Sequence, residues 1–275
     1  MLQNSSTLRE SLSQPEYLSL KALKLERKAT GRPARRPWHS IARPNQLPPP
    51  GDWRIWLFLA GRGTGKTRAG AEWVLAQVRA GAKRVALVAP IASDARDVMV
   101  EGESGLMSIV SASERPNYEP SKRRLTFPNG AIATTYSADE PDRLRGPQHD
   151  AAWCDELAAW RYPETWDMLL LGLRLGQDPR AIVTTTPRPV KIIRDLLSNP
   201  TVATTRGNTY ENRANLAPAF FEQIVGRYEG TGLGRQEIHA ELLEDMPGAL
   251  CTRAELDAHR VTAHPELSRI VTAID

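Results

Sequence analysis

Cysteine is scarce in this sequence, and long apolar runs are missing. The two cysteines, Cys154 and Cys251, lie far apart without the spacing of metal ligands or of a disulfide framework, which indicates a reducing compartment. No apolar run approaches the roughly 18 residues of a membrane span, and the first residues lack the apolar stretch of a signal peptide. We therefore expect neither a membrane protein nor a secreted one.

What is present is an ordinary globular balance. The 275 residues are 41% hydrophobic and 25% charged, which excludes a wholly disordered chain and leaves room for one large domain or two small ones. The net charge is only +4, and nine Lys and Arg residues against four acids within residues 1–52 place the basic excess in an N-terminal arm. Such an arm either binds nucleic acid or an acidic partner, or is a solvated tail.

The arm is also rich in proline. It holds 7 of the 21 prolines and ends in Leu47-Pro-Pro-Pro50. Because proline blocks helix propagation, we expect residues 1–50 to be mostly extended, with a short basic helix over 16–29. Folded structure is expected to begin near Asp52.

Beyond the arm, short apolar segments alternate with helical patterns. Strands are expected at 56–60, 84–89, 125–127, 131–136, 151–154, 181–185 and 202–205, and helices at 67–80, 95–100, 164–175, 189–198, 218–229 and 232–243. Pro128-Asn-Gly130 indicates a hairpin between two of the strands. This alternation predicts an α/β fold with a mainly parallel sheet flanked by helices.

A phosphate-binding loop is the strongest motif. Ala60-Gly61-Arg62-Gly63-Thr64-Gly65-Lys66-Thr67 follows an expected strand and opens an expected helix. Its glycines let backbone N–H groups surround phosphates, Lys66 would reach the β- and γ-phosphates, and Thr67 would offer its hydroxyl to Mg²⁺. Ala60 replaces the glycine that usually opens the motif. The pattern predicts a nucleotide site in a P-loop NTPase fold.

Acids and hydroxyls follow two later strands. Asp155 would hold Mg²⁺ and Glu156 would polarise the attacking water, because acids at the end of a neighbouring strand lie beside the phosphates. The run Thr184-Thr185-Thr186 either senses the γ-phosphate or is simply a β-branched strand end.

Arginines lie in two of these segments. Arg62 is inside the loop, and Arg143 and Arg145 precede the acids. Any of them would either stabilise the transition state or form an ordinary surface salt bridge.

Taken together, these residues resemble the large terminase subunit of tailed phages and of gene-transfer-agent particles. The resemblance runs from about Trp38 to Asp275. It rests on the segments 42–49, 56–74, 136–146, 153–160, 184–187 and 208–243.

The resemblance implies a role for each matching residue. Lys66 and Thr67 match the Walker A lysine and hydroxyl, Asp155 and Glu156 the Walker B acid and catalytic glutamate, and Thr184–Thr186 a coupling motif. Arg62 matches the P-loop arginine, Arg145 an arginine that acts on a neighbouring subunit, and Gln46 an adenine-reading glutamine.

The resemblance also implies the setting of the activity. It suggests a Mg²⁺-dependent ATPase that moves double-stranded DNA into a procapsid, in the cytoplasm of a bacterial host. The expected partners are the portal protein, the small terminase subunit and further copies of this chain in a ring.

The expected domains are an arm at 1–50, an ATPase core at 51–207, a helical lid at 208–247 and, at 248–275, a linker with the first strand of an RNase H-like nuclease. Asp275 matches the first metal ligand of that nuclease. One carboxylate cannot build a two-metal site, so we expect a motor without nuclease activity.

Two alternatives remain open at this point. One is a helicase-like or repair P-loop ATPase that acts on DNA. The other is an inactive prophage remnant that binds nucleotide, a portal protein or a small terminase subunit without turnover.

Overall fold

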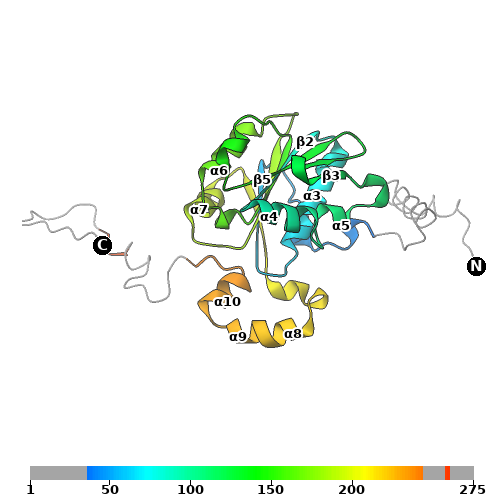
Figure 1. Cartoon of the computed structure of the whole chain (residues 1–275). Helices are drawn as coiled ribbons and strands as arrows, with labels where there is room; N and C mark the ends of the chain where they lie inside the picture. Colours follow the sequence, from blue (N-terminus) through cyan, green and yellow to red (C-terminus); the bar gives the residue numbers. More distant parts are fainter. Residues whose placement is uncertain (1–35, 244–257, 261–275) are drawn as a thin grey trace, which may run out of the picture.

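A single eight-stranded sheet forms the centre of the molecule (Figure 1). The computed structural model describes residues 36–243 and 258–260. The strand order is β3-β4-β5-β2-β6-β7-β1-β8. All neighbouring strands pair in parallel except β4, which is antiparallel to both β3 and β5. The predicted mainly parallel α/β sheet is confirmed.

The central strands are short and mostly apolar, as buried parallel strands are. Their bounds are β1 Ile55–Ala60, β2 Arg84–Ala89, β3 Asn117–Glu119, β4 Arg124–Thr126, β5 Ile132–Ser137, β6 Ala151–Asp155, β7 Arg180–Thr185 and β8 Val202–Gly207. The strands expected from the sequence are all present. The short strand β3 was not expected.

Helices cover both faces of the sheet, which makes three layers. Along β1, Trp56, Phe58 and Ala60 face one apolar cluster, while Ile55, Leu57 and Leu59 face the other. The first cluster packs under α3 (Lys66–Ala80), the π-helical turn Ala95–Val100 and α5 (Leu106–Ile109), and the second under α6 (Glu164–Gly172) and α7 (Lys191–Ser198). Because both faces are covered, alternate residues of each central strand are equally buried.

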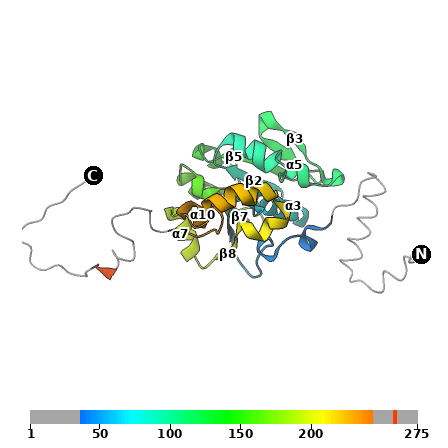
Figure 2. The same ribbon diagram turned by 90° about the horizontal axis from the view of Figure 1, so that it is seen from below.

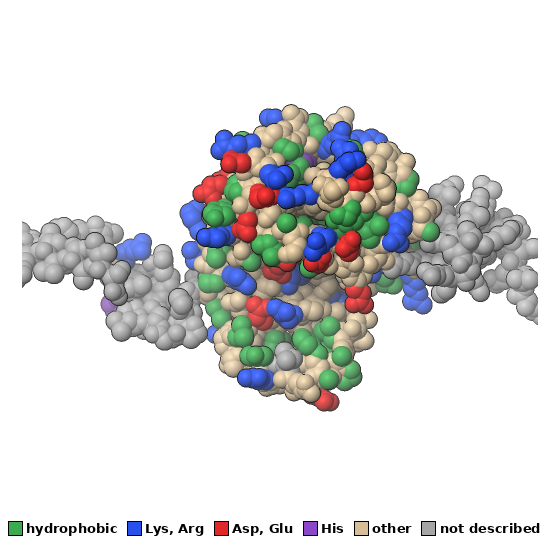
Figure 3. Space-filling model, in the orientation of Figure 1, with side chains coloured by type: hydrophobic (Ala, Val, Ile, Leu, Met, Phe, Trp, Pro, Cys, Tyr) green, Lys and Arg blue, Asp and Glu red, His purple; other side chains and the backbone are tan. Residues whose placement is uncertain are grey.

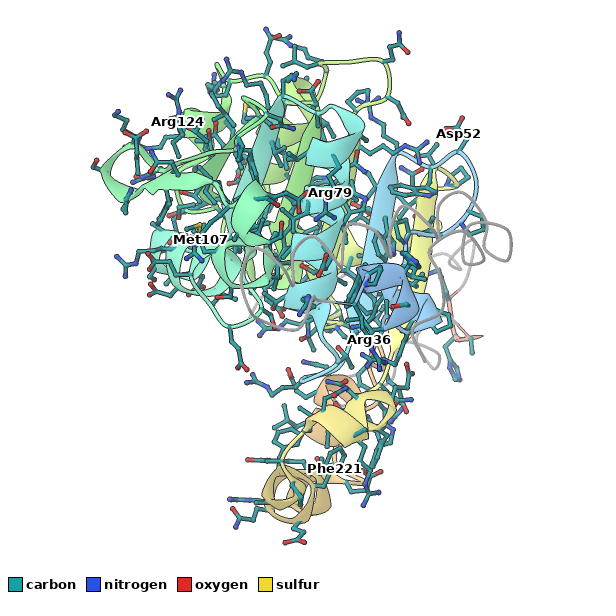
Figure 4. All side chains as sticks on the ribbon, turned by 90° about the vertical axis from the view of Figure 1, so that its right-hand side faces the viewer. Arg36, Asp52, Arg79, Met107, Arg124 and Phe221 are labelled. Carbon is teal, nitrogen blue, oxygen red and sulfur yellow. The ribbon has the colours of Figure 1, made fainter. Side chains whose placement is uncertain are left out.

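A small helical part, called the lid here, lies beside the carboxyl ends of the strands (Figures 1 and 2). It follows β8 and comprises the 3₁₀ segment η8 (Thr209–Asn215), α8 (Pro218–Phe220), the π-helical turn Phe221–Val225, α9 (Gly226–Tyr228) and α10 (Gly232–Glu237). Phe221, Val225 and Ile238 form its own small core. Figure 4 shows Phe221 in the lid, far from the sheet.

Several element boundaries differ from expectation. Helix α6 ends at Gly172 rather than 175, because Leu175 donates its N–H to the carbonyl of His149 and Leu173 forms a β-bridge with His149. Helix α10 ends at Glu237 rather than 243, and Ala240 then adopts a positive φ of 58°.

Folded structure begins well before Asp52, contrary to expectation. Residues 38–40 and 44–46 form 3₁₀ turns, and the side chain of Gln46 is buried. Contacts with the phosphate-binding loop replace the expected extended chain. The helix expected at 16–29 and the segment 248–257 lie outside the described residues, and the domain boundaries stay predictions.

No helix in the described residues is long and apolar enough to cross a membrane.

Gly70 of α3 packs tightly against the sheet. A Cβ added at Gly70 would lie 2.3 Å from Cε2 of Trp153, whose ring is fully buried in β6. We expect Gly70→Ala to lower the free energy of unfolding by about 1–3 kcal/mol through overpacking, although alanine favours helix more than glycine does. Urea denaturation measures this. Gly146→Ala is the matched control, because nothing lies within 4 Å of a Cβ there, and equal effects of the two variants would contradict the prediction.

Candidate functional site

The phosphate-binding loop connects β1 to α3 in the arrangement that the sequence predicts. Gly63 and Gly65 have φ values of 73° and 81°, in the left-handed region that favours glycine. The hydroxyl of Thr64 donates to the carbonyl of Gly61 at 2.7 Å, which closes the loop on itself. The first turn of α3 begins directly at Lys66, so the free N–H groups of a helix start face the inside of the loop.

Lys66 lies at the centre of the site. Its Nζ donates to the carbonyls of Ala60 and Gly61 at 3.0 and 3.2 Å and to Oγ1 of Thr186 at 3.1 Å. It also forms an ion pair with Oε1 of Glu156 at 3.5 Å. The structure therefore brings together three segments that are far apart in the sequence.

The sheet order explains this convergence. Strand β7 lies between β6 and β1, and all three run in parallel. Their carboxyl ends meet at one edge, where β6 ends in Asp155, β7 leads into Thr186 and β1 leads into the loop.

Asp155 is a buried carboxylate with an unusual pKa. Its Oδ1 accepts a hydrogen bond from Oγ1 of Thr184 at 2.6 Å. Burial, and then the charge of Glu156, raise the pKa of Asp155 to about 7, although Thr184 and Lys66 act in the opposite direction. A cation that approaches Asp155 would therefore favour its ionised form.

Glu156 has a backbone conformation that is rare for a residue with a side chain. Its φ is 47° and its ψ is 46°, in the left-handed region. Its Oε2 accepts hydrogen bonds from the backbone N–H of Thr186 at 3.1 Å and from Oγ1 of Thr185 at 3.4 Å. Strained conformations of this kind occur preferentially at functional sites.

The three threonines each have a different partner. Thr184 connects Trp153, whose Nε1 donates to it at 2.8 Å, with Asp155. Thr185 accepts from the backbone N–H of Ala158 at 3.2 Å and donates toward Glu156, and Thr186 binds Lys66. The run is therefore more than a β-branched strand end, because each hydroxyl contacts a polar group of the site.

The arginines do not all lie at the site. Arg62 is 74% exposed, and its Nε lies 3.9 Å from Oε2 of Glu237 in the lid. Arg145 points to solvent, paired with Asp142 at 2.8 Å, and Arg143 pairs with Glu140 at 2.9 Å. Neither Arg143 nor Arg145 lines the cleft described next, so any role of Arg145 in catalysis would have to be exerted on another subunit.

A cleft of about 960 Å³ lies over the loop. This volume falls at the upper end of the range for small-molecule sites, about 300–1,000 Å³. The lining residues come from the N-terminal segment, the loop, the segment at 97–104, the strand ends and the lid; they include Trp38, Arg43, Gln46, Arg62, Gly63, Thr64, Gly65, Lys66, Thr67, Asp97, Glu103, Glu156, Thr186, Asn212 and Leu216.

Sequence reasoning missed three residues that bind the loop. Arg43, Thr209 and Asn212 donate hydrogen bonds to the backbone carbonyls of Thr64, Arg62 and Gly63, respectively. All three lie in segments that the resemblance covers, but nothing in their local pattern indicates a contact with the loop. Gln46 lines the cleft, and its side chain bonds the loop and the backbone N–H of Arg43.

Asp275 lies outside the described residues. Within residues 36–243 and 258–260, no group of three or more His, Cys, Asp or Glu side chains could hold a metal ion.

One family model matches most of the sequence. A family model described as "Terminase large subunit, T4likevirus-type, N-terminal" matches residues 57–256. No curated protein matches the chain.

Solved structures share the fold. The large terminase ATPase domain of Thermus phage P74-26 is 16% identical, with a TM-score of 0.57 over 79% of this chain and 97% of that domain. A large terminase from a thermophilic bacteriophage, in complex with ADP, is also 16% identical, with a TM-score of 0.59 over 75% of this chain. A second structure of that thermophilic phage terminase holds ATP-γ-S and is 14% identical, with a TM-score of 0.57 over 75% of this chain.

The chain spans 51% of the thermophilic phage terminase bound to ADP and 50% of the one bound to ATP-γ-S. Sequence identities of 14–16% show only that the fold is shared, but the family model matches well over half of the sequence. The chain therefore belongs to the family of large terminase subunits.

Proposed function

We propose that this chain is an ATPase subunit of a DNA-packaging motor, which hydrolyses ATP in the cleft and moves double-stranded DNA into a procapsid. One observation carries the proposal. Lys66, Asp155, Glu156 and Thr186 converge at one edge of the sheet, around a loop built for phosphate. The structures of related large terminases with ADP and ATP-γ-S support the choice of nucleotide.

The residues of the loop fit a nucleoside triphosphate with Mg²⁺. Backbone N–H groups of Gly63–Thr67 would hold the phosphates, Lys66 would exchange its carbonyl partners for phosphate oxygens, and Thr67 and Asp155 would hold Mg²⁺. The raised pKa of the buried Asp155 fits a cation site, because a nearby cation would restore its ionised form. Mg²⁺ would neutralise the charge that develops on the phosphates during transfer.

Glu156 is placed to orient and deprotonate water. Its carboxylate faces the cleft, and hydrogen bonds from Thr185 and Thr186 hold it there. Because Thr186 contacts both Lys66 and Glu156, loss of the terminal phosphate would change the contacts of the loop and of the water-orienting group together.

The lid gives a route from this change to motion. It is bonded to the loop through its backbone, since the N–H of Arg62 donates to the carbonyl of Glu237 at 2.6 Å. A rearrangement of the loop would therefore shift the lid as well.

DNA binding would require several subunits. Basic and acidic side chains are interspersed over the face shown in Figure 3, so one subunit offers no continuous basic surface there. We infer weak, salt-sensitive DNA binding by a single subunit and useful affinity in a ring at the portal. The portal protein and the small terminase subunit would be its partners.

Hydrolysis across a range of protein concentrations tests the proposal. We expect Mg²⁺-dependent ATP hydrolysis by the pure protein, and loss of nucleotide binding and hydrolysis in Lys66→Ala. A rate per subunit that rises with concentration would indicate a ring, and Arg145→Ala would then lose only this rise, because Arg145 lies outside its own cleft. Absence of both nucleotide binding and hydrolysis in the unaltered protein would overturn the proposal.

A further inference from the structure

The N-terminal segment before β1 folds directly onto the phosphate-binding loop. Two of its side chains, Arg43 and Gln46, reach backbone carbonyls of the loop. Figure 4 shows the start of this segment, at Arg36, where the sheet meets the lid. The segment therefore contacts the loop directly through these two side chains, while Nε of Arg43 and Oδ1 of Asn45 are buried without a hydrogen-bond partner among the described residues.

The amide of Gln46 is already used by the protein. Its Nε2 donates to the carbonyls of Thr64 at 3.2 Å and Gly65 at 3.4 Å, and its Oε1 accepts from the backbone N–H of Arg43 at 3.1 Å. A glutamine amide has two N–H donors, and both have partners here. Because Gln46 is only 5% exposed, donating from its amide nitrogen to a base would break buried hydrogen bonds to the loop.

The loop is shaped around this amide. A Cβ added at Gly65 would lie 2.6 Å from Nε2 of Gln46, and Gly65 has a φ of +81°. The position therefore requires glycine for two separate reasons. One is its backbone conformation and the other is the closeness of Gln46.

Arg43 connects the same loop to the lid. One of its guanidinium nitrogens, Nη2, donates to the carbonyl of Thr64, and the other, Nη1, donates to Oδ1 of Asn212 at 2.7 Å. The amide of Asn212 in turn donates to the carbonyl of Gly63 at 2.6 Å. Arg43 and Asn212 thus hold consecutive loop carbonyls from two sides.

We propose that Arg43 and Gln46 form a clamp that keeps the loop in its phosphate-binding shape, and that Gln46 positions the loop instead of reading adenine. The inference rests on the proposed nucleotide site and assigns these residues a role in it. The clamp acts on the phosphate half of any nucleotide, whatever its base. This interpretation differs from the adenine-reading role that the resemblance implies for Gln46.

A ligand without a base separates the two roles. Inorganic tripolyphosphate with Mg²⁺ is used to displace a fluorescent ATP analogue from the full chain, and its affinity is compared with that of ATP. For Gln46→Ala we expect both affinities to fall by the same factor, about tenfold for two lost hydrogen bonds. A fall for ATP with unchanged tripolyphosphate affinity would show base reading and overturn the proposal.

Arg43→Lys is the second variant, because one ammonium cannot bond Thr64 and Asn212 in the fixed fork of a guanidinium. We expect it also to weaken ATP and tripolyphosphate equally. Gln77→Ala is the control, since Gln77 lies at the far end of α3 and outside the cleft. Equal melting temperatures of the variants confirm that they are folded.

The outcomes also separate the inference from the function on which it rests. If the unaltered chain does not bind the ATP analogue, the proposed function fails. If it binds the analogue and the tripolyphosphate affinity is unchanged in both Gln46→Ala and Arg43→Lys, the clamp fails while the function stands.

Discussion

Glu156→Gln is expected to lower kcat for ATP hydrolysis by about 10²–10⁴-fold, the usual contribution of a general base. The amide keeps the size of the carboxylate and can still accept from the N–H of Thr186, so the site should keep its shape. It can no longer take a proton from water. Nucleotide affinity, measured with a fluorescent analogue, should change little.

A matched variant distinguishes chemistry from binding. Lys66→Ala removes the contact with Thr186 and the ion pair with Glu156, and we expect it to lose affinity as well as turnover. Single-turnover measurements at saturating ATP separate the two effects. An unchanged single-turnover rate in Glu156→Gln would remove Glu156 from the mechanism.

Asp155→Asn is expected to abolish hydrolysis and yet to stabilise the protein without nucleotide. Burial and the neighbouring Glu156 raise the pKa of Asp155 to about 7 in the folded state, against an ordinary value near 3.8. Between these two values the unfolded chain releases a proton that the folded chain keeps. The stability contribution of Asp155 is therefore fully present below about pH 4 and is lost as the pH rises through 7.

Asparagine does not titrate, so the advantage of the variant should grow with pH. Between pH 5.5 and 8.5 we expect its gain over the unaltered protein to increase by about 2 kcal/mol, which is roughly 4–8 °C in melting temperature. Melting curves at these two pH values, without nucleotide or Mg²⁺, measure this. A difference that is the same at both values would show that Asp155 is already ionised in the fold.

Local patterns in the sequence predicted the central elements because their physical causes are local. The apolar runs at 84–89 and 181–185 favour buried strands because they are short and rich in β-branched residues, and the glycines around Lys66 permit the positive φ values that the loop requires. Pro128-Asn-Gly130 gave the hairpin of β4 and β5 for the same reason.

The rest depends on contacts between distant segments. The polar strand β3 forms only because β4 offers an edge, so its own sequence carries no apolar signal. The segment at 38–46 was expected to be extended because the whole arm is rich in proline, although it holds only Pro44 itself. It folds because Gln46 and Arg43 find partners in the loop. The sequence left open whether Arg145 acts on a neighbouring subunit or forms a surface salt bridge, and in the structure it is exposed and pairs with Asp142.

Strand β8 has a mechanical consequence. It pairs with β1 in parallel over six residues, from Ile55 with Val202 to Ala60 with Gly207, and it leads straight into the lid. A pull on the lid along this direction loads all the backbone hydrogen bonds of the pair in shear at once, whereas a hairpin pulled from its open end would unzip one bond at a time. The connection between the lid and the sheet therefore resists a pull by shear of the whole β1–β8 pair, and force on the lid would reach the loop after β1 without separating the strands one bond at a time.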